Sequence, residues 1–409
     1  MHDYRSQLFR LSCVALTVTS MTFAIRAGIL GQLGLEFGLT DTELGWINAM
    51  AFLGFPVATM FGGAIYNAIG ARKLLVLAFL CHFLGLTLTV TADGFWGLLI
   101  STFLIGFANG SVEAGCNPLI AELYPQKKTT MLNRFHVWFP GGIVIGAIAS
   151  NVMTSWGLSW QWQVSIILLP NLLYGAMMLK AYFPDTHGFE HSTISNLKHL
   201  ISPVYLFLVL CMTFTATAEL GTQQWIERIL GASGASPMLI LALMAGLMAI
   251  GRYFAGPIVK TLNPAGVLLA SAVLSTAGIY MLSQVSGGAV YFAVILFALG
   301  VTYFWPTMLG CAAEYTPKTG AMGMSLLGGA GMFAVSMWNP IIGSWIDTAR
   351  VNAQASNASD TQVGIDVAQA VLSNLLFFPA VLIVAFIGFY FYVAKCHASA
   401  AHAPSSISN

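Results

Sequence analysis

The chain has 409 residues, of which 57% are hydrophobic and only 8% are charged, and its mean hydropathy is +0.79. Charged residues make up about a quarter of an average soluble domain, so this composition excludes a soluble globular protein and indicates one that crosses a membrane many times. The formal net charge of +1 gives no reason to expect a nucleic acid partner.

A membrane-spanning helix needs about 20 mainly apolar residues, and the sequence contains twelve such stretches. The first follows a basic start and continues well beyond the core of a signal peptide, so we predict that it is retained as a transmembrane helix. The predicted spans lie near residues 8–32, 43–68, 74–91, 95–120, 135–155, 161–183, 202–223, 237–259, 265–284, 288–311, 320–345 and 369–394. The predicted fold class is therefore an all-α polytopic membrane protein.

Two polar stretches interrupt the later spans. Pro184–His199 is predicted to be a linker, and Asp347–Ala368 is predicted to be a second polar loop. Lysine and arginine gather in the loops and ends on the linker's side of the membrane, whereas the other side holds only Arg228 and Arg350. Because basic loops stay in the cytoplasm, both termini are expected there, with the protein in the plasma (inner) membrane.

The chain also contains an internal repeat. Ala121–Pro125 (AELYP) and Ala313–Pro317 (AEYTP) each end a span and lie 192 residues apart. This spacing predicts two similar six-helix halves, which alternate access to a site between them, and one chain could then act as a monomer. The predicted organisation is an N-terminal half at 1–183, a cytoplasmic linker at 184–200, a C-terminal half at 201–395 and a disordered cytoplasmic tail at 396–409.

Twelve spans in two halves, with a Gly and basic loop after the second and eighth, resemble the major facilitator superfamily. Within it, the fourth and fifth spans resemble the fucose:proton symporter family, through Glu113 with Asn117 and Pro118, Leu132 with Asn133, and the glycines Gly141, Gly142 and Gly146. The resemblance implies a transporter in which Glu113 is the proton-linked residue.

Glu113 is a carboxylate among small residues inside a span. An ionisable group in hydrocarbon is costly and usually serves a substrate or proton pathway, so we predict that Glu113 carries the coupling proton. The alternative is a permanent ion pair, for example with Arg26. Asn117, one helical turn after Glu113, is included in the predicted substrate site.

Arg26 lies inside the first span and cannot discharge itself there. We expect it to face the central cavity, where its fork of donors binds either Glu113 or an anionic or hydroxylated substrate. The alternative is that it lies high enough for its head to reach the membrane surface.

Polar and aromatic residues of the C-terminal half complete the predicted substrate site. A sugar needs partners for its hydroxyl groups and flat rings for its C–H faces. Prolines next to two of the candidates mark helix kinks, where cavities often form. The alternatives are a helix emerging into water for Glu219, Gln223 and Gln224, a packed core side chain for Trp305, and a position near the outer interface for Asn339. The predicted residues are Glu219, Gln223, Gln224 and Trp225 in the seventh span, Trp305 in the tenth and Asn339 in the eleventh.

The resulting prediction is secondary active transport: symport of a monosaccharide or a related polyhydroxylated solute with protons, by alternating access. The first alternative is a proton-coupled transporter of an organic anion or sugar acid that uses Arg26 as the anion-binding residue. A transporter-like sensor is disfavoured, since that role does not require buried charges. An enzyme is not expected, because no nucleophile, base and metal can be assembled from these spans. The six cysteines are single and show no metal-ligand spacing, so no disulfide, metal or cofactor is expected.

Overall fold

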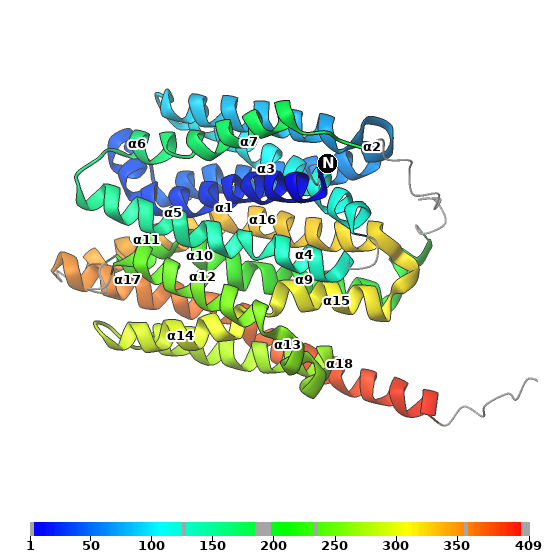
Figure 1. Cartoon of the computed structure of the whole chain (residues 1–409). Coiled ribbons are helices and arrows are strands. Elements are labelled where there is room, and N and C mark those ends of the chain that lie inside the picture. The colour runs from blue at the N-terminus through cyan, green and yellow to red at the C-terminus, as the bar shows by residue number, and fades with distance from the viewer. Residues whose placement is uncertain (1–3, 125–127, 185–197, 232–235, 356–358, 402–409) are drawn as a thin grey trace, which may run out of the picture.

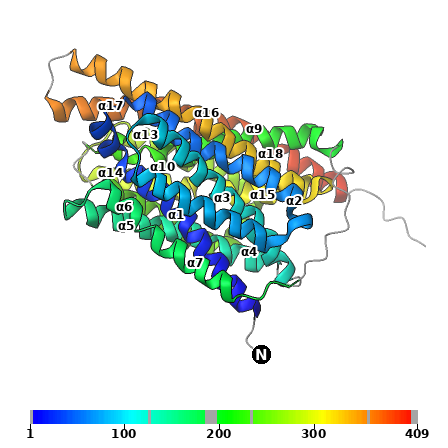
Figure 2. The ribbon, with the colours of Figure 1, turned by 90° about the horizontal axis from the view of Figure 1, so that it is seen from above.

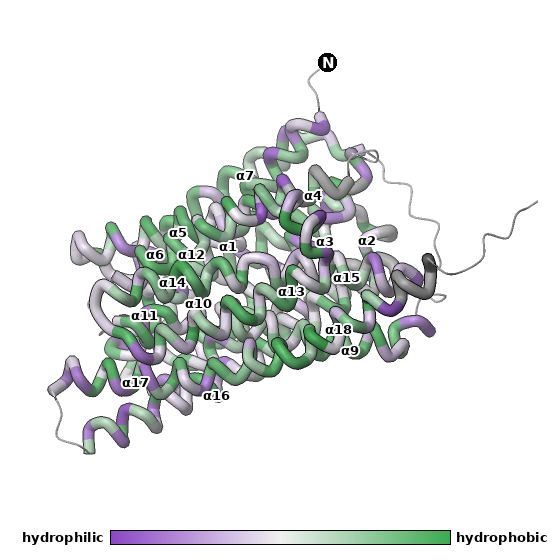
Figure 3. The backbone as a smooth tube through the Cα atoms, turned by 90° about the horizontal axis from the view of Figure 1, so that it is seen from below, coloured by the Kyte–Doolittle hydropathy of each residue, from purple (hydrophilic) through white to green (hydrophobic). Residues whose placement is uncertain are grey.

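The computed structural model of the chain describes residues 4–124, 128–184, 198–231, 236–355 and 359–401. Figures 1 and 2 show helices running side by side along one long axis, with α1 beginning and α18 ending at the same end of the bundle. We call this the terminal end, and we call the opposite end, where α16 meets α17, the hairpin end. Figure 3 shows hydrophilic residues gathered toward both ends and hydrophobic residues along the length between them, as a bilayer requires.

Helices are the one kind of regular secondary structure in the described residues. In order along the chain, the helices are α1 (Tyr4–Phe37), α2 (Asp41–Val90), α3 (Phe95–Leu123), α4 (Lys128–His136), α5 (Trp138–Ser155), α6 (Trp160–Ser165), α7 (Leu168–Lys180), η1 (Lys198–Ile201), α9 (Pro203–Ala216), η2 (Thr217–Gly221), α10 (Thr222–Gln224), α11 (Ile226–Leu230), α12 (Pro237–Tyr253), α13 (Ala255–Leu282), α14 (Ala289–Val301), α15 (Phe304–Tyr315), η3 (Pro317–Thr319), α16 (Gly320–Gln354), α17 (Asp360–Leu375) and α18 (Phe377–Ala401).

Eleven helical segments in the described part of the chain are long and apolar enough to cross a membrane. The shorter apolar helix α12 leads through Phe254 directly into α13 and supplies the remaining predicted span. The expected all-helical membrane fold is therefore confirmed.

Two long helices each turn back on themselves. α2 bends at Gly70, which has φ 75°, and α13 bends at Asn263, which has φ 53°. Glycine adopts positive φ without strain, and asparagine tolerates it better than most residues. The two bends lie 193 residues apart, close to the 192-residue repeat in the sequence.

Figure 1 shows α2, α3 and α7 in its upper part and α13, α14 and α18 in its lower part. The two groups meet where α2 packs on α16, α5 on α12, and α1 on α11. This arrangement agrees with the predicted division into halves, which stays a proposal.

The structure corrects the predicted polar loop at Asp347–Ala368, because most of it is helical. α16 continues to Gln354, and α17 begins at Asp360, where the Ser359 side chain accepts a hydrogen bond from the backbone of Gln362. Polar residues can remain helical here because a cap and a packed face support them: Val363 and Val367 are buried.

The chain's last segment and its linker are only partly described. α18 extends to Ala401, past residue 396, where a disordered tail was expected. Residues 402–409 lie outside the described part of the chain, and so do residues 185–197 of the predicted linker.

The hairpin end is predicted to face the outside of the cell. Gln362 is exposed near the start of α17, so a Gln362→Cys variant should react with a membrane-impermeant maleimide added to intact cells. The unsubstituted chain is the control. Reaction only after the cells are permeabilised would contradict this orientation.

Candidate solute and proton sites

Arg26 is held between the two groups of helices. Its side chain is only 7% exposed. Nε donates to Asn48 Oδ1 in α2 and to Gln224 Oε1 in α10, each at 3.0 Å, and Nη2 donates to the same Gln224 oxygen at 2.7 Å. The Gln224 amide nitrogen donates in turn to the carbonyl of Phe23 at 3.0 Å. One glutamine thus ties α10 to α1 through both ends of its side-chain amide.

The partners of Arg26 are neutral. Among the described residues no carboxylate forms a salt bridge with it. The Arg26–Glu113 pair considered from the sequence is therefore not formed in this structure, and the guanidinium is buried rather than exposed at the protein surface. Among the described residues, no acidic side chain pairs with this buried cation.

Aromatic side chains lie against one side of Arg26. The guanidinium carbon lies 5.0 Å from the centre of the Phe23 ring and 5.6 Å from that of Phe52. Both rings belong to a buried cluster that joins the two groups of helices, with the half-buried Phe139 and Trp305 packed against it. Its buried members are Phe23, Phe52, Phe55, Ala216, Leu220, Met332 and Val335. Trp305, predicted to stack on the solute, therefore lies in this aromatic region.

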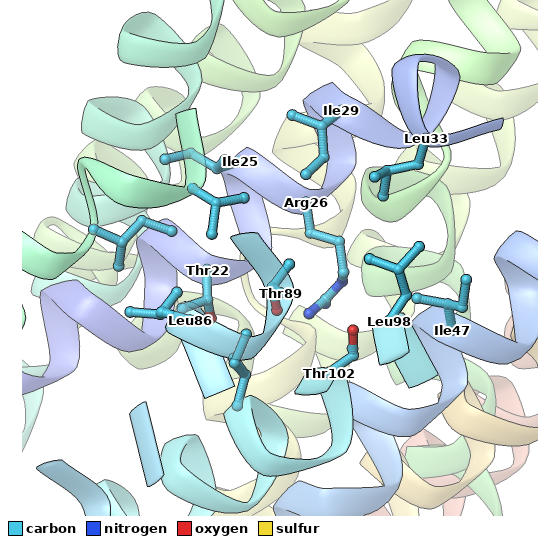
Figure 4. A pocket seen from close by; sticks show the side chains of 13 residues that line it. Thr22, Ile25, Arg26, Ile29, Leu33, Ile47, Leu86, Thr89, Leu98 and Thr102 are labelled. Atoms are coloured by element: carbon cyan, nitrogen blue, oxygen red, sulfur yellow. The ribbon is translucent and has the colours of Figure 1, made fainter. Parts of the chain in front are cut away.

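A small cavity lies on another side of Arg26. Figure 4 shows the Arg26 side chain pointing toward the hydroxyl groups of Thr89 and Thr102, with Thr22 nearby. The cavity has a volume of about 30 Å³, and the rest of its lining is aliphatic. A water molecule needs about 10 to 15 Å³ of such volume, so there is room for one or two waters beside the guanidinium but not for an organic solute.

Trp225 and Asn339 contact each other. Trp225 is fully buried, and its Nε1 donates to Asn339 Oδ1 at 3.0 Å, while Asn339 Nδ2 donates to the carbonyl of Val335 at 2.8 Å. The predicted aromatic face and amide are thus used to bind α16 to the chain between α10 and α11. Gln223 is also buried, with its amide nitrogen 3.5 Å from the sulfur of Met248.

Glu219 forms an ion pair inside the membrane region. It is 4% exposed and lies in η2, a π-helical turn. Its Oε1 accepts from Arg252 Nη2 at 3.1 Å, and Arg252 Nε donates to the carbonyl of Thr302 at 2.9 Å. The sequence predicts Glu219 as a substrate-binding residue. In the structure its carboxylate is paired with Arg252 of α12.

Glu113 lies in a short polar chain near the terminal end. Asn117 Nδ2 donates to Glu113 Oε2 at 2.5 Å, and Asn117 Oδ1 lies 3.1 Å from His136 Nε2. The same histidine nitrogen is 4.0 Å from Glu113 Oε2. Glu113 and Asn117, both predicted site residues, thus contact each other, and the nearby basic group is His136 rather than Arg26.

Ion pairs close the hairpin end between the two groups of helices. Asp41 is fully buried and accepts from Arg228 Nε at 2.6 Å, from Arg228 Nη2 at 2.7 Å and from Arg350 Nη1 at 2.7 Å. Asp347 accepts from the backbone nitrogens of Asp41 and Thr42 at 3.0 and 2.9 Å. An acidic group at the start of α2 is also favoured by the helix dipole. We call Asp41, Arg228, Arg350 and Asp347 the hairpin-end gate.

Glu227 adds a contact beside the gate. Its Oε2 accepts from the backbone nitrogen of Gly31 at 3.1 Å, joining α11 to α1. Burial raises the pKa of the Glu227 carboxyl, although Arg228 opposes this effect. In this structure the carboxyl of Glu227 therefore holds a proton more tightly than it would in water.

The chain matches the family described as Major Facilitator Superfamily over residues 12–339. It is 23% identical over 332 residues to a gentisate transporter of Corynebacterium glutamicum, covering 72% of this chain and 73% of that protein. It is also 23% identical over 178 residues to the galactose-proton symporter of Escherichia coli K12, covering 43% of this chain but only 38% of that one. Several other matched relatives are likewise covered over less than half their length.

The fold is similar to that of a solved bacterial homologue of the human lysosomal transporter Spinster, described as inward-facing and unoccupied. The TM-score is 0.76 at 15% identity, with 97% of this chain and 98% of that chain covered. The family match covers most of the sequence, and the structural likeness covers nearly the whole fold. The chain therefore belongs to the major facilitator superfamily, whose members are secondary transporters and not enzymes.

Proposed function

We propose that this transporter carries a small organic anion together with protons, and that Arg26 binds the anion. The observation that carries the proposal is the buried guanidinium, whose hydrogen-bond partners among the described residues are neutral amides. Burying a charge without a partner of opposite sign is costly in a membrane protein. A carboxylate ligand would supply the missing charge and would match the planar fork of the arginine with two oxygens.

The surroundings of Arg26 favour an anion with a flat, apolar body. The rings of Phe23 and Phe52 lie against the guanidinium, and Trp305 packs against the same cluster. Aromatic walls stabilise apolar and aromatic groups more than they stabilise hydroxyl groups. The similarity to a gentisate transporter also supports this class of solute. Gln224 would then position Arg26, and the approach of solute would compete for its hydrogen bonds.

A monosaccharide is the second candidate. It is favoured by the similarity to a galactose-proton symporter and by the buried amides of Gln223 and Gln224, which suit hydroxyl groups. The resemblance to the fucose:proton symporter family rests on Glu113 and Asn117, which do contact each other. A neutral sugar would, however, leave the charge of Arg26 without a counter-ion.

A binding panel separates the two candidates. Purified protein would be heated with aromatic and aliphatic monocarboxylates, sugar acids and neutral sugars, because a ligand that binds only the folded state raises the melting temperature. Stabilisation by carboxylates, and not by the corresponding neutral amides or alcohols, is expected. Stabilisation by neutral sugars alone would overturn the anion proposal in favour of the second candidate.

We propose that Glu113 carries a coupling proton between the two sides of the membrane. Asn117 and His136 lie within reach of its carboxylate, and they place the group near the terminal end, where a proton could be released. We propose that the protein lies in the plasma membrane with both termini on the cytoplasmic side. In the transport cycle a single chain acts as a monomer, and its two halves rock against each other.

Glu113→Gln should abolish accumulation driven by a pH gradient and spare exchange of solute. A glutamine stays neutral and can permit reorientation but cannot release a proton. A one-unit pH gradient supports about tenfold accumulation for each coupled proton, and the variant should lose this factor. Uptake and counterflow in proteoliposomes measure the two activities.

The matched control for this variant is Glu122→Gln. Glu122 lies on the same helix, outside the predicted span, and accepts a hydrogen bond from Tyr66 at 3.1 Å. It should accumulate solute like the unsubstituted chain. Wild-type accumulation by Glu113→Gln, with an unchanged pH dependence, would rule out the role given to Glu113.

A further inference from the structure

We infer that Glu219 is a second proton-binding site, and that its pairing with Arg252 couples the proton to the residue that holds Arg26. This inference rests on the proposed proton-coupled function, which it deepens by placing a titrating carboxyl in the C-terminal group of helices. The geometry around Glu219 supports it.

Only one of the two Glu219 carboxylate oxygens has a hydrogen-bond partner among the described residues. Oε1 accepts one hydrogen bond from Arg252, whereas Oε2 is buried and has no hydrogen-bond partner. Buried carboxylate oxygens normally accept hydrogen bonds, and an ion pair in a membrane needs such bonds to be stable. An oxygen without a donor is a position where a proton can bind without displacing an existing hydrogen bond.

Arg252 contacts a second group besides Glu219. Its Nε donates to the carbonyl of Thr302, at the interruption between α14 and α15. The side chain of Arg252 is 16% exposed and that of Glu219 is 5% exposed, so the arginine forms the wetter side of the pair. If Glu219 takes up a proton and becomes neutral, Arg252 keeps its bond to Thr302 but loses the charge that ties it to η2.

The charged surroundings of Glu219 are simple. The π-helical turn packs against α9, α10, α16 and α18, and Arg252 reaches it from α12. Among the described residues, Arg252 is the one charged side chain that forms a salt bridge with Glu219. A further titratable group, Tyr303, donates through its hydroxyl to the carbonyl of Gly251, the residue before Arg252, at 3.0 Å.

The π-helical turn connects the two sites. It spans Thr217–Gly221 and continues directly into α10, which ends at Gln224, the residue that holds Arg26. A π-helical turn is rare, holds its backbone less well than an α-helix, and is frequently found at functional sites. Breaking the ion pair between Glu219 and Arg252 therefore affects the same short segment that positions the proposed anion site. Protonation of Glu219 and occupation of Arg26 would then be linked.

Infrared difference spectroscopy between acid and alkaline pH tests the protonation directly. A buried carboxylic acid absorbs at a higher frequency than a hydrated one, so the unsubstituted protein should show such a band on acidification. Glu113→Gln, which removes the other proposed proton carrier, should keep a band, and so should the exposed-site control Glu314→Gln, whereas the double variant Glu113→Gln/Glu219→Gln should lose it. In the Glu113→Gln background, Glu219→Asp retains a carboxyl and should shift the band, which keeps the test decisive if the double glutamine variant does not fold. No titrating band in Glu113→Gln, or the same band in the double variant, would overturn the inference.

Transport provides the second readout. Glu219→Gln in proteoliposomes should lose gradient-driven accumulation, about tenfold per pH unit for one proton, and retain counterflow. Full accumulation would overturn the link between the proton and the cycle. The proposed function fails separately if the protein exchanges no organic anion, because the infrared result does not depend on a solute.

Discussion

Replacing Arg26 by alanine is expected to weaken binding of the transported anion by about 30-fold or more. Truncating one partner of a buried, hydrogen-bonded charge pair costs about 2 to 5 kcal/mol, and 2 kcal/mol corresponds to about 30-fold in Kd. Arg26→Lys keeps the charge but loses the planar fork, so it should recover only part of the affinity. Ligand titrations of the purified variants measure the change.

Two further variants keep this test interpretable. Arg26→Ala leaves the Gln224 and Asn48 oxygens without their donor and can lower stability by itself. Arg26→Gln retains hydrogen-bond donors without the charge and should lose anion binding while unfolding at a temperature closer to that of the unsubstituted chain. Arg10→Ala removes one positive charge from the exposed start of the same helix and should bind the anion normally. Wild-type affinity in Arg26→Gln would contradict the assignment.

Asp41→Asn is expected to open the hairpin-end gate. Asp41 is fully buried and pairs with two partly exposed arginines, Arg228 and Arg350, so Asp41→Asn leaves both arginines without this partner. Breaking a buried ion pair from one side costs about 3 to 5 kcal/mol, and each 1.4 kcal/mol changes an equilibrium about tenfold. Because solvent screens the partly exposed arginines, the expected cost lies at the low end of this range, and the closed arrangement should lose about 100-fold in its population relative to the open one.

Labelling of a cysteine at Ser336 reports this opening. Ser336 is buried where α16 packs on α2, and its hydroxyl donates to the carbonyl of Ala49 at 2.8 Å. Ser336→Cys should react slowly with maleimide in the parent chain and at least about tenfold faster in the Asp41→Asn background. Asp360→Asn removes an exposed carboxylate at the same end and should leave the rate unchanged. Equal rates in all three chains would show that the ion pairs do not hold the gate.

The helical fold could be predicted because its signal is local. Apolar stretches of about 20 residues identify membrane spans without knowledge of their neighbours, and they correctly indicated an all-helical membrane protein. The predicted loop at Asp347–Ala368 is wrong because a polar sequence does not by itself exclude a helix. A helix that projects from the membrane can have a polar sequence, and the buried Val363 and Val367 show that one face of α17 is packed.

The candidate residues could be predicted more readily than their partners. An arginine or glutamate in an apolar span stands out in the sequence, which is how Arg26, Glu113 and Glu219 were selected. The contact between Arg26 and Gln224 joins residues 198 positions apart, and the contact between Asp41 and Arg350 joins residues 309 positions apart. Such pairings depend on how helices pack, and no periodicity in one sequence specifies them.

Uptake into proteoliposomes tests whether the chain couples protons to the movement of an organic anion bound by Arg26. The measurement is uptake of a radiolabelled anion, chosen from the binding panel, with and without an acid-outside pH gradient. We expect about tenfold accumulation per pH unit and coupled proton in the unsubstituted chain, and none in Arg26→Gln. Equal uptake with and without the gradient, or accumulation of the anion by Arg26→Gln, would contradict it.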